Sequence, residues 1–329
     1  MAASSRFVWM NGRMVAFEDA TVHFLTPGLH YGIGVFEGIR CYATAGGPAI
    51  FCLGEHMRRL FDSARVLGFV DLPFTREQLT DAVRQVVSAN GFEECYIRPL
   101  IYLAEGGWNL SLDTGRPHVA VAVWKWEAYL GPEALEHGVR ANVSSFTRHH
   151  ANVMMTKAKV SGNYANSVLA KTESRRLGFD EAIMLDAQGY VAECTGENIF
   201  LARDGALYTP PAAAILEGIT RDSLMVLARE LGLAVTAEPI SRDQLYIADE
   251  VFVCGTAAEV IALREIDGRT IGTGKAGPIT RLLQRQFADV VHGRHPMSRT
   301  WLEPVPPDLW RAREAPLFHS AGRESRAEA

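Results

Sequence analysis

The feature of the sequence that most constrains the fold is a series of short apolar segments, each bounded by residues that favour tight turns. Asn11 and Gly12 separate two apolar stretches in FVWMNGRMVAF, a pairing typical of a two-residue hairpin turn. The chain is therefore predicted to open with antiparallel strands. Further hairpin turns are predicted at Gly46-Gly47, Asp204-Gly205 and Asp267-Gly268.

Helical periodicity accompanies these segments in the first 126 residues. In EHMRRLFDSARVLGF, apolar residues recur at the spacing of one helix face, and a second helix is predicted from about Thr75 to Ala89. The segments CYIRPLIYLAEG and PHVAVAVWKW indicate buried strands. Residues 1–126 are therefore predicted to form a small α+β domain.

Glycine and proline interrupt this pattern in EAYLGPEALEHG, which indicates an interdomain connection over 127–137. A larger domain is predicted over 138–302, with a helix after Ser161, a strand at EAIMLD and helices at TRDSLMVLAREL, SRDQLYIAD and ITRLLQRQFADVV. The tail, 303–329, is rich in proline and charge and is expected to be poorly ordered.

Composition limits the kinds of protein that this chain can be. The 329 residues are 48% hydrophobic and 22% charged, a profile typical of globular proteins with sizeable cores. The formal net charge of −5 gives no overall attraction to nucleic acid or to a membrane surface, so small metabolites are the expected partners. No apolar run of about 18 residues occurs. Because MAASSRFVWMNG also lacks the features of a secretory signal, a cytoplasmic protein is expected.

Several common site types lack support in the sequence. The cysteines are scattered without a C-x-x-C motif, which favours reduced thiols over disulfides or a zinc site. In GIGVFEG the third glycine falls one residue late for a dinucleotide-binding loop. There is no P-loop, G-x-S-x-G elbow or H-E-x-x-H pair, and the adjacent His149 and His150 do not suit one metal ion. No metal is therefore expected.

Two lysines precede the helix predicted after Ser161. Most lysines in such a place are solvated surface charges. An aldehyde cofactor that links to lysine, however, needs a desolvated amine, a carboxylate for its ring nitrogen, and backbone that binds a phosphate. In TKAKVSGNY, Lys157 and Lys159 are both candidates for the amine, because an extended lead-in would place them on one face.

The remaining requirements of such a cofactor have candidates further along the chain. Glu193 and Glu197 are the competing carboxylates, at a predicted bend beside a strand. Glycine-led stretches that start at Gly218 and Gly255 can offer free N–H groups and hydroxyls to a phosphate. A guanidinium from Arg58 or Arg59 is the candidate that completes this anion site.

Taken together, these segments resemble the branched-chain amino acid aminotransferases, which are pyridoxal-phosphate enzymes of fold type IV in the class IV aminotransferase family. The resemblance runs from about Phe7 to about Val291, through YGIGVFEGIRCY, HMRRLFDSA, YIRPL, TKAKVSGNY, AECTGENIF, LEGITRDS and ADEVFVCGTAAE. It implies a D-amino acid aminotransferase-like fold, with a small N-terminal α+β domain and a larger domain of mixed sheets with a barrel-like core.

The resemblance also implies roles for particular residues. Lys159 is the catalytic lysine that carries pyridoxal 5′-phosphate, Glu193 faces its ring nitrogen and Tyr164 its ring hydroxyl. The implied phosphate site comprises Arg59, Ile219, Thr220 and Thr256. The implied substrate site comprises Tyr31, Phe36, Gly38, Tyr96, Arg98, Leu110, Trp126, Tyr129, Thr256 and Ala257.

The implied activity is transfer of the amino group of leucine, isoleucine or valine to 2-oxoglutarate, by a homodimer or a multiple of dimers. Tyr31 and the loop near Leu110 are expected to reach the neighbouring subunit's site. Arg98 is a candidate to meet the side-chain carboxylate of glutamate, with a sheet-edge ion pair as the alternative. The sequence EGGWNLSL departs from the small and aliphatic loop common in the family, which bears on substrate range.

Other functions remain open at this point. A D-amino acid or (R)-amine transaminase, or an aminodeoxychorismate lyase, would share the fold and keep Lys159 and Glu193. A non-catalytic α/β binding protein, with structural glycines and lysines, is the alternative of another class. A yellow colour that borohydride bleaches would separate it from the enzymes.

Overall fold

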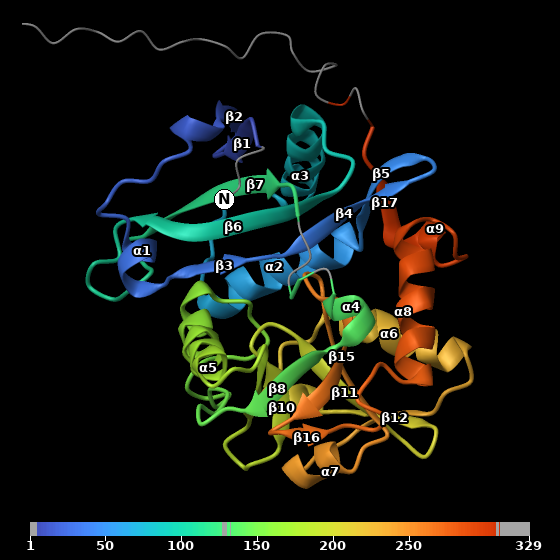
Figure 1. The fold of residues 1–329 in the computed structure, drawn as a ribbon. Helices are drawn as coiled ribbons and strands as arrows, with labels where there is room; N and C mark the ends of the chain where they lie inside the picture. Colours follow the sequence, from blue (N-terminus) through green and yellow to red (C-terminus); the bar gives the residue numbers. More distant parts are fainter. Residues whose placement is uncertain (1–4, 127–129, 132, 307–308, 310–329) are drawn as a thin grey trace, which may run out of the picture.

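Two β-sheets organise the protein, one above the other in Figure 1. The computed structural model describes residues 5–126, 130–131, 133–306 and 309. Within them the first sheet has eight strands, in the order β17-β5-β4-β6-β7-β1-β2, and β3 pairs with β6 beyond the end of β4. Its strands are β1 (Phe7–Met10), β2 (Arg13–Ala16), β3 (Gly34–Phe36), β4 (Ile39–Thr44), β5 (Gly47–Phe51), β6 (Cys95–Glu105), β7 (Arg116–Trp124) and β17 (Leu302–Pro304).

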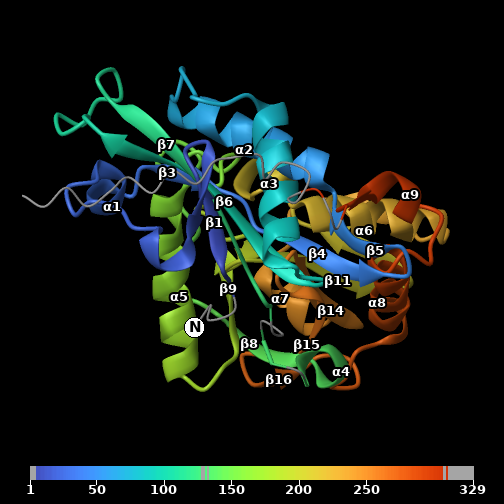
Figure 2. The same cartoon turned by 90° about the horizontal axis from the view of Figure 1, so that it is seen from above.

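Two long helices, α2 (Leu53–Leu67) and α3 (Arg76–Asn90), cover one face of this sheet and lie next to each other in Figure 2. Strand β6 shows why the sheet has two different faces, since its side chains alternate. Ile97 and Ile101 pack in the core with α2 and α3, whereas Tyr96 and Arg98 point to the opposite side and line a cavity. The short helix α1 (Pro27–Tyr31) precedes β3.

The second sheet is mixed and has nine strands within the described residues. Its order is β10-β9-β8-β15-β14-β11-β12-β13, with β16 on β15, and the β8–β9, β8–β15 and β12–β13 pairs are parallel. The strands are β8 (Val139–Val143), β9 (Glu181–Leu185), β10 (Val191–Cys194), β11 (Asn198–Arg203), β12 (Ala206–Thr209), β13 (Val235–Ala237), β14 (Glu250–Gly255), β15 (Glu259–Ile266) and β16 (Arg269–Thr270).

Helices flank the second sheet on opposite sides of the molecule, with α5 on one side and α8 and α9 on the other in both views. The helices are α4 (Ala134–His137), α5 (Tyr164–Arg176), α6 (Ile219–Glu230), α7 (Arg242–Tyr246), α8 (Pro278–Val291) and α9 (Ser298–Trp301). Short 3₁₀ turns span Phe17–Asp19, Ser161–Asn163 and Ala212–Ala214. None of the helices within the described ranges has the length and apolar character needed to cross a bilayer.

A shared apolar core joins the two halves. Tyr42 and Phe51 of the first sheet pack in one buried cluster with Leu227 of α6 and Phe287 of α8. The Phe51 and Phe287 rings meet edge to face, with centroids 5.4 Å apart. This contact holds the two sheets in a fixed relation, and the cavities described below lie between them.

The predicted α+β class with a mixed second sheet is confirmed, and most local predictions agree with the structure. Asn11 and Gly12 have φ values of 46° and 93°, as a turn with two left-handed residues requires. The turns at Asp204-Gly205 and Asp267-Gly268 are likewise left-handed at both residues. The second hairpin turns one residue earlier than predicted, because Thr44 already pairs with Gly47.

The predicted start of the tail is wrong, and the predicted connection contains a short helix. Residues 303–304, predicted to belong to a poorly ordered tail, form part of β17, which pairs with β5, and Val305 behind them is buried. The part of the tail at 307–308 and 310–329 lies outside the described residues. Residues 134–137, predicted to belong to the connection, form α4, and Ala134 packs in the core of the second sheet. The division into domains at 126 and 138 stays a prediction.

Glu250 shows how a buried charge fixes α8 against the second sheet. Its carboxylate accepts hydrogen bonds from the backbone N–H groups of Ile279 and Thr280, at 2.9 and 2.8 Å, and from the Thr280 hydroxyl at 2.6 Å. The N-cap residue Gly277 offers no side chain for this purpose. Glu250 therefore replaces the usual helix cap from a neighbouring strand.

We expect Glu250→Gln to lower the free energy of unfolding by about 2 to 3 kcal/mol. The substitution replaces one carboxylate oxygen by an NH₂ group, which cannot accept a hydrogen bond from the first turn of α8. Urea unfolding followed by circular dichroism measures this loss. Glu230→Gln, at an exposed position on α6, is the control and should leave the transition unchanged. Equal transitions for both variants would contradict the capping role.

Candidate functional site

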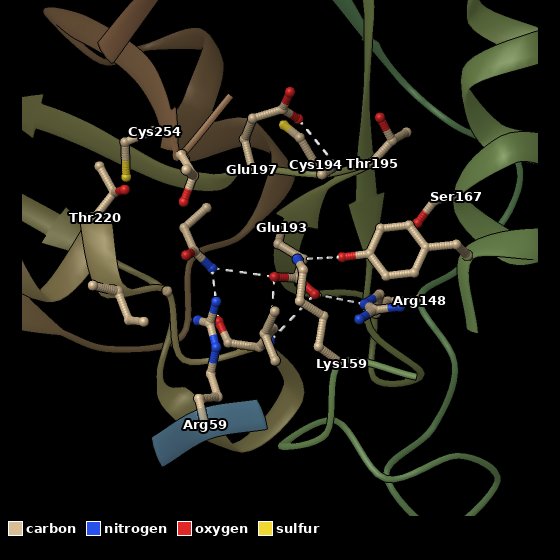
Figure 3. A pocket seen from close by; sticks show the side chains of 18 residues that line it. Arg59, Arg148, Lys159, Ser167, Glu193, Cys194, Thr195, Glu197, Thr220 and Cys254 are labelled. Carbon is tan, nitrogen blue, oxygen red and sulfur yellow. Dashed lines mark hydrogen bonds and ion pairs between the residues drawn. The ribbon is translucent and has the colours of Figure 1, made fainter. Parts of the chain in front are cut away.

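A pocket between the two halves collects polar side chains from six segments of the chain (Figure 3). Arg59 comes from α2, Lys159 from the segment before α5, and Glu193 from β10. Thr220 lies in the first turn of α6, and Thr256 directly after β14. The structure thus brings together the lysine, the acid and the anion-binding residues that the sequence predicted.

Packing explains why Lys159 faces this pocket. Its neighbours Ala158 and Val160 are buried in the core of the first half. The Lys159 N–H donates to the Ser63 hydroxyl at 3.0 Å, and its carbonyl accepts from the Phe36 N–H at 3.1 Å. With both neighbours held in the core, the side chain between them must point away from it, into the pocket.

The structure separates the two lysines that the sequence could not. The Lys159 amine lies 2.7 Å from the Tyr164 hydroxyl, and both residues line the pocket. Lys157 is exposed, and its amine pairs with the Glu217 carboxylate at 2.9 Å. The expectation that both lie on one face is wrong, because residues 156–158 form a turn and a bend instead of an extended strand.

Glu193 is held by several groups. The pairing of β10 with β9 shifts register between Val191 and Glu193, and such irregularities re-aim a side chain. The Glu193 carboxylate accepts from Arg148 Nε at 2.6 Å and from Asn198 Nδ2 at 3.1 Å. Burial raises the pKa of the Glu193 carboxyl, while Arg148 and the Leu216 N–H act to lower it.

The rival carboxylate, Glu197, has a different environment. It is 4% exposed, its Oε2 accepts only from the N–H of the adjacent Gly196, and its Oε1 has no partner within the described residues. Burial, reinforced by the nearby Glu181, raises the pKa of Glu197 to about 8. Glu197 is therefore largely neutral at pH 7, whereas the Arg148 contact favours the charged form of Glu193.

The opposite end of the pocket suits an anion. Helix α6 begins at Ile219, and no side chain caps the N–H groups of its first turn, because the N-cap residue is Gly218. Thr220 adds a hydroxyl there, and Thr256 lies on the same pocket wall. Arg59 extends toward this end from α2, whereas Arg58 is exposed and lines only the neighbouring cleft, to which Arg59 also contributes. Arg59 is thus the arginine that faces the pocket.

A second cavity, of about 480 Å³, adjoins Lys159 and Tyr164. The Arg98 guanidinium lies 4.6 Å from the Phe36 ring centroid, and the Tyr96 and Trp126 rings stack 4.4 Å apart. Among the described residues no carboxylate comes within ion-pair distance of Arg98, and its buried Nε has no hydrogen-bond partner. The further described wall residues of this cavity are Leu100, Ser161, Gly196, Glu197 and Ala257.

Of the predicted substrate residues that the structure describes, Tyr31, Leu110 and Gly38 do not line these cavities. Tyr31 and Leu110 are 41% and 79% exposed, and Tyr31 packs edge to face on Trp108. Tyr129 lies outside the described residues. Gly38 is next to the cavity residue Tyr96, since a Cβ on Gly38 would come within 1.9 Å of the Tyr96 hydroxyl. The absence of a side chain at Gly38 thus leaves the space that the Tyr96 hydroxyl occupies.

Sequence reasoning missed Arg148, Asn198 and Glu37. Arg148 follows β8 in a loop without a motif, so no local signal indicated its contact with Glu193. Asn198 lies within the GENIF segment, directly after Glu197 and five residues after Glu193. The charge of Glu37 within the otherwise apolar GIGVFEG is a signal that could have drawn attention to it. Its contacts are described below.

Comparison with known proteins identifies the family. The model of the family described as amino-transferase class IV matches residues 34–266, more than half of the chain. The chain belongs to the class IV aminotransferase family. The branched-chain-amino-acid aminotransferase of Pseudomonas aeruginosa is 48% identical to this class IV aminotransferase over 301 residues, which are 92% of this chain and 98% of the relative. The Escherichia coli K12 enzyme of the same name is 44% identical, covering 91% and 97%.

Solved structures agree with this assignment and with the predicted fold type. The T.th. branched-chain amino acid aminotransferase with pyridoxamine 5′-phosphate is 49% identical, with a TM-score of 0.88 over 92% of this chain and 99% of that chain. The Escherichia coli branched-chain amino acid aminotransferase is 43% identical, with a TM-score of 0.89 over 92% and 100%. The predicted resemblance to branched-chain aminotransferases of fold type IV is therefore confirmed.

The raised pKa of Glu197 predicts a pH effect on stability. The folded protein keeps a proton on Glu197 between about pH 4.5 and about pH 8, where the unfolded chain has released it, so the folded state loses stability as the pH rises through this range. Because Glu197→Gln lacks this titration, its melting temperature should increasingly exceed that of the wild type toward about pH 8.5. Differential scanning calorimetry at several pH values measures this.

The control for this experiment is Glu136→Gln, at an exposed position on α4. Its difference from the wild type should not change with pH. A pH-independent difference for Glu197→Gln as well would show that Glu197 is ionised in the folded protein.

Proposed function

We propose that this protein is a pyridoxal-phosphate-dependent aminotransferase that moves the amino group of leucine, isoleucine or valine to 2-oxoglutarate, giving branched-chain 2-oxo acids and L-glutamate. The observation that carries the proposal is the Lys159 amine, 2.7 Å from the Tyr164 hydroxyl, between a buried carboxylate and an anion site. Family membership and relatives named for this activity support it.

The pocket fits the cofactor at each of its functional ends. The uncapped first turn of α6, with Thr220, Thr256 and Arg59, suits a phosphate. Glu193 is the carboxylate that would meet the ring nitrogen, and Arg148 and Asn198 fix its position. When bound, pyridoxal phosphate supplies an aldehyde that exchanges amino groups and a ring that accepts electrons. Related structures contain pyridoxamine 5′-phosphate and N-(5′-phosphopyridoxyl)-L-glutamate.

Each site residue then has a task. Lys159 would hold the cofactor through its amine, and the same amine, once free, would move the proton between the substrate Cα and C4′. Tyr164 hydrogen-bonds this amine and orients it, and Phe36 packs against the Tyr164 ring with centroids 4.9 Å apart. Glu193 would keep a proton on the ring nitrogen of the bound cofactor. Glu197, neutral and buried nearby, adds no second negative charge at pH 7.

The adjoining cavity suits the substrate side chain. Phe36, Tyr96, Leu100 and Trp126 provide an apolar lining for a branched aliphatic group. Arg98 is the cation of this lining that can meet the second carboxylate of glutamate or 2-oxoglutarate, since burying an unpaired carboxylate costs several kcal/mol. One pocket thereby accepts both an aliphatic and an acidic side chain.

We also propose a homodimer, or a multiple of dimers, in the cytoplasm. Apolar side chains cluster in two segments that lie together in the first half, near α1 and in the loop after β6. Their exposure supports burial against a second copy, and the resemblance directs Tyr31 and Leu110 to the partner's site. The free, buried cysteines suit a reducing compartment. The exposed apolar residues are Phe24, Leu25, Leu29, Tyr31, Trp108 and Leu110.

Replacing Lys159 should separate cofactor attachment from folding. We expect Lys159→Ala to abolish covalent attachment and aminotransfer while the melting temperature stays close to that of the wild type. Lys157→Ala, which removes an exposed amine paired with Glu217, is the matched control and should keep full activity. Peptide mass spectrometry after borohydride reduction locates the cofactor. An adduct on Lys157 would contradict the assignment.

Replacing Arg98 should separate the two classes of substrate. We expect Arg98→Met to raise the KM for glutamate and 2-oxoglutarate at least about tenfold, or about 1.4 kcal/mol, with a much smaller change for leucine. Steady-state assays with each substrate measure this. Equal losses for leucine and glutamate would instead indicate a general defect of the pocket. D-Alanine and (R)-phenylethylamine in the same assay test the related transaminases.

A further inference from the structure

A buried cluster of three charged or titratable side chains lies directly behind the anion end of the pocket. Glu37 follows β3, and its carboxylate is completely buried. Its Oε1 accepts from Arg59 Nε at 2.6 Å, and its Oε2 accepts from Arg59 Nη2 at 2.8 Å. His56, one turn before Arg59 on α2, meets Oε2 through Nδ1 at 2.8 Å.

The hydrogen bonds of Arg59 leave part of its guanidinium available. A guanidinium has five N–H bonds in a rigid plane. Two point to Glu37, and a third, from Nη1, donates to the Glu217 carbonyl at 2.7 Å. The remaining N–H bonds, one on Nη1 and one on Nη2, have no hydrogen-bond partner among the described residues. Arg59 lines the pocket (Figure 3), so these N–H bonds are available to an anion.

The charge of Glu37 is unfavourable for an anion bound next to Arg59. A carboxylate beside the guanidinium cancels part of its field and repels a phosphate. An arginine that served only as a source of charge would bind phosphate better without Glu37. The two-point contact must therefore act through geometry, because a long arginine side chain otherwise has many rotamers to lose on binding.

We propose that Glu37 is a positioning residue that holds the Arg59 guanidinium in the orientation that receives the cofactor phosphate, and that His56 fixes the Glu37 carboxylate. The inference rests on the proposed function. Burial acts to raise the pKa of the Glu37 carboxyl, but Arg59 and His56 outweigh it and hold this pKa well below its usual value. Burial lowers the pKa of His56. Glu37 is thus charged and His56 is a neutral donor.

The same segment also serves the substrate cavity. Phe36 faces that cavity, whereas the next residue, Glu37, points to the opposite side, as alternation along a strand requires. The Glu37 N–H donates to the Pro99 carbonyl at 3.0 Å, which anchors the segment to β6. Two consecutive residues therefore have different tasks: Phe36 lines the substrate cavity, and Glu37 holds Arg59.

The test compares two aldehydes that differ only in the phosphate. Full-length protein freed of its cofactor is titrated with pyridoxal 5′-phosphate and with pyridoxal, and binding is followed by absorbance. For Glu37→Gln we expect at least about tenfold weaker binding of pyridoxal 5′-phosphate and an unchanged affinity for pyridoxal. In an Arg59→Gln background, Glu37→Gln should have no further effect.

Other outcomes overturn the inference. An unchanged or tighter affinity for pyridoxal 5′-phosphate would mean that Glu37 does not orient Arg59, and an equal loss for both aldehydes would mean a general structural role. Glu303→Gln, which removes a carboxylate paired with Arg84 away from the pocket, should keep the wild-type ratio. If Glu37→Gln does not fold, Glu37→Asp is measured, and a wild-type ratio there overturns the inference. A wild type that binds neither aldehyde refutes the proposed function instead.

Discussion

The site depends on the way the segment around Lys159 is bound to the first half of the molecule. Ala158 and Val160 lie in the core with α2 and α3, and the backbone of Lys159 hydrogen-bonds both Ser63 and Phe36. Full burial of a valine side chain alone is worth about 1.5 to 3 kcal/mol. The reactive amine is therefore presented by residues of one half to a pocket whose acid and anion site come mainly from the other half.

The buried carboxyl groups of Glu193 and Glu197 lie in the same pocket as this amine, and their surroundings differ. Glu193 is compensated by Arg148 and Asn198, whereas Glu197 has only one backbone donor and a raised pKa. Burial raises the pKa of both carboxyl groups, and the partners of Glu193 oppose this effect more strongly than the single backbone donor of Glu197 does. The same logic governs the other end of the pocket, where Glu37 balances Arg59. The pocket holds several buried ionisable groups, and each is stabilised by a specific contact.

Sequence reasoning succeeded where the determining interactions are local. The turn at Asn11-Gly12 and the helix after Thr75 follow from backbone preferences of adjacent residues, and Thr75 forms the capping box of α3 with Gln78. The choice of Lys159 over Lys157 came from the family resemblance, since spacing left both open. The contacts of Arg148 with Glu193, and of Glu37 with Arg59, join residues 45 and 22 positions apart. Local patterns carry no information about such pairs.

The return of the chain to the first sheet at β17 gives the molecule a particular topology. Strand β17 pairs with β5, so the second half is an insertion within the first, attached through both of its ends. A unit joined by a single connection can swivel about it, whereas one joined at two separate points can rotate only about the line between them. The buried cluster that Phe51 shares with Leu227 and Phe287 blocks that remaining rotation as well, so two chain connections and a common core together keep the pocket walls in one alignment.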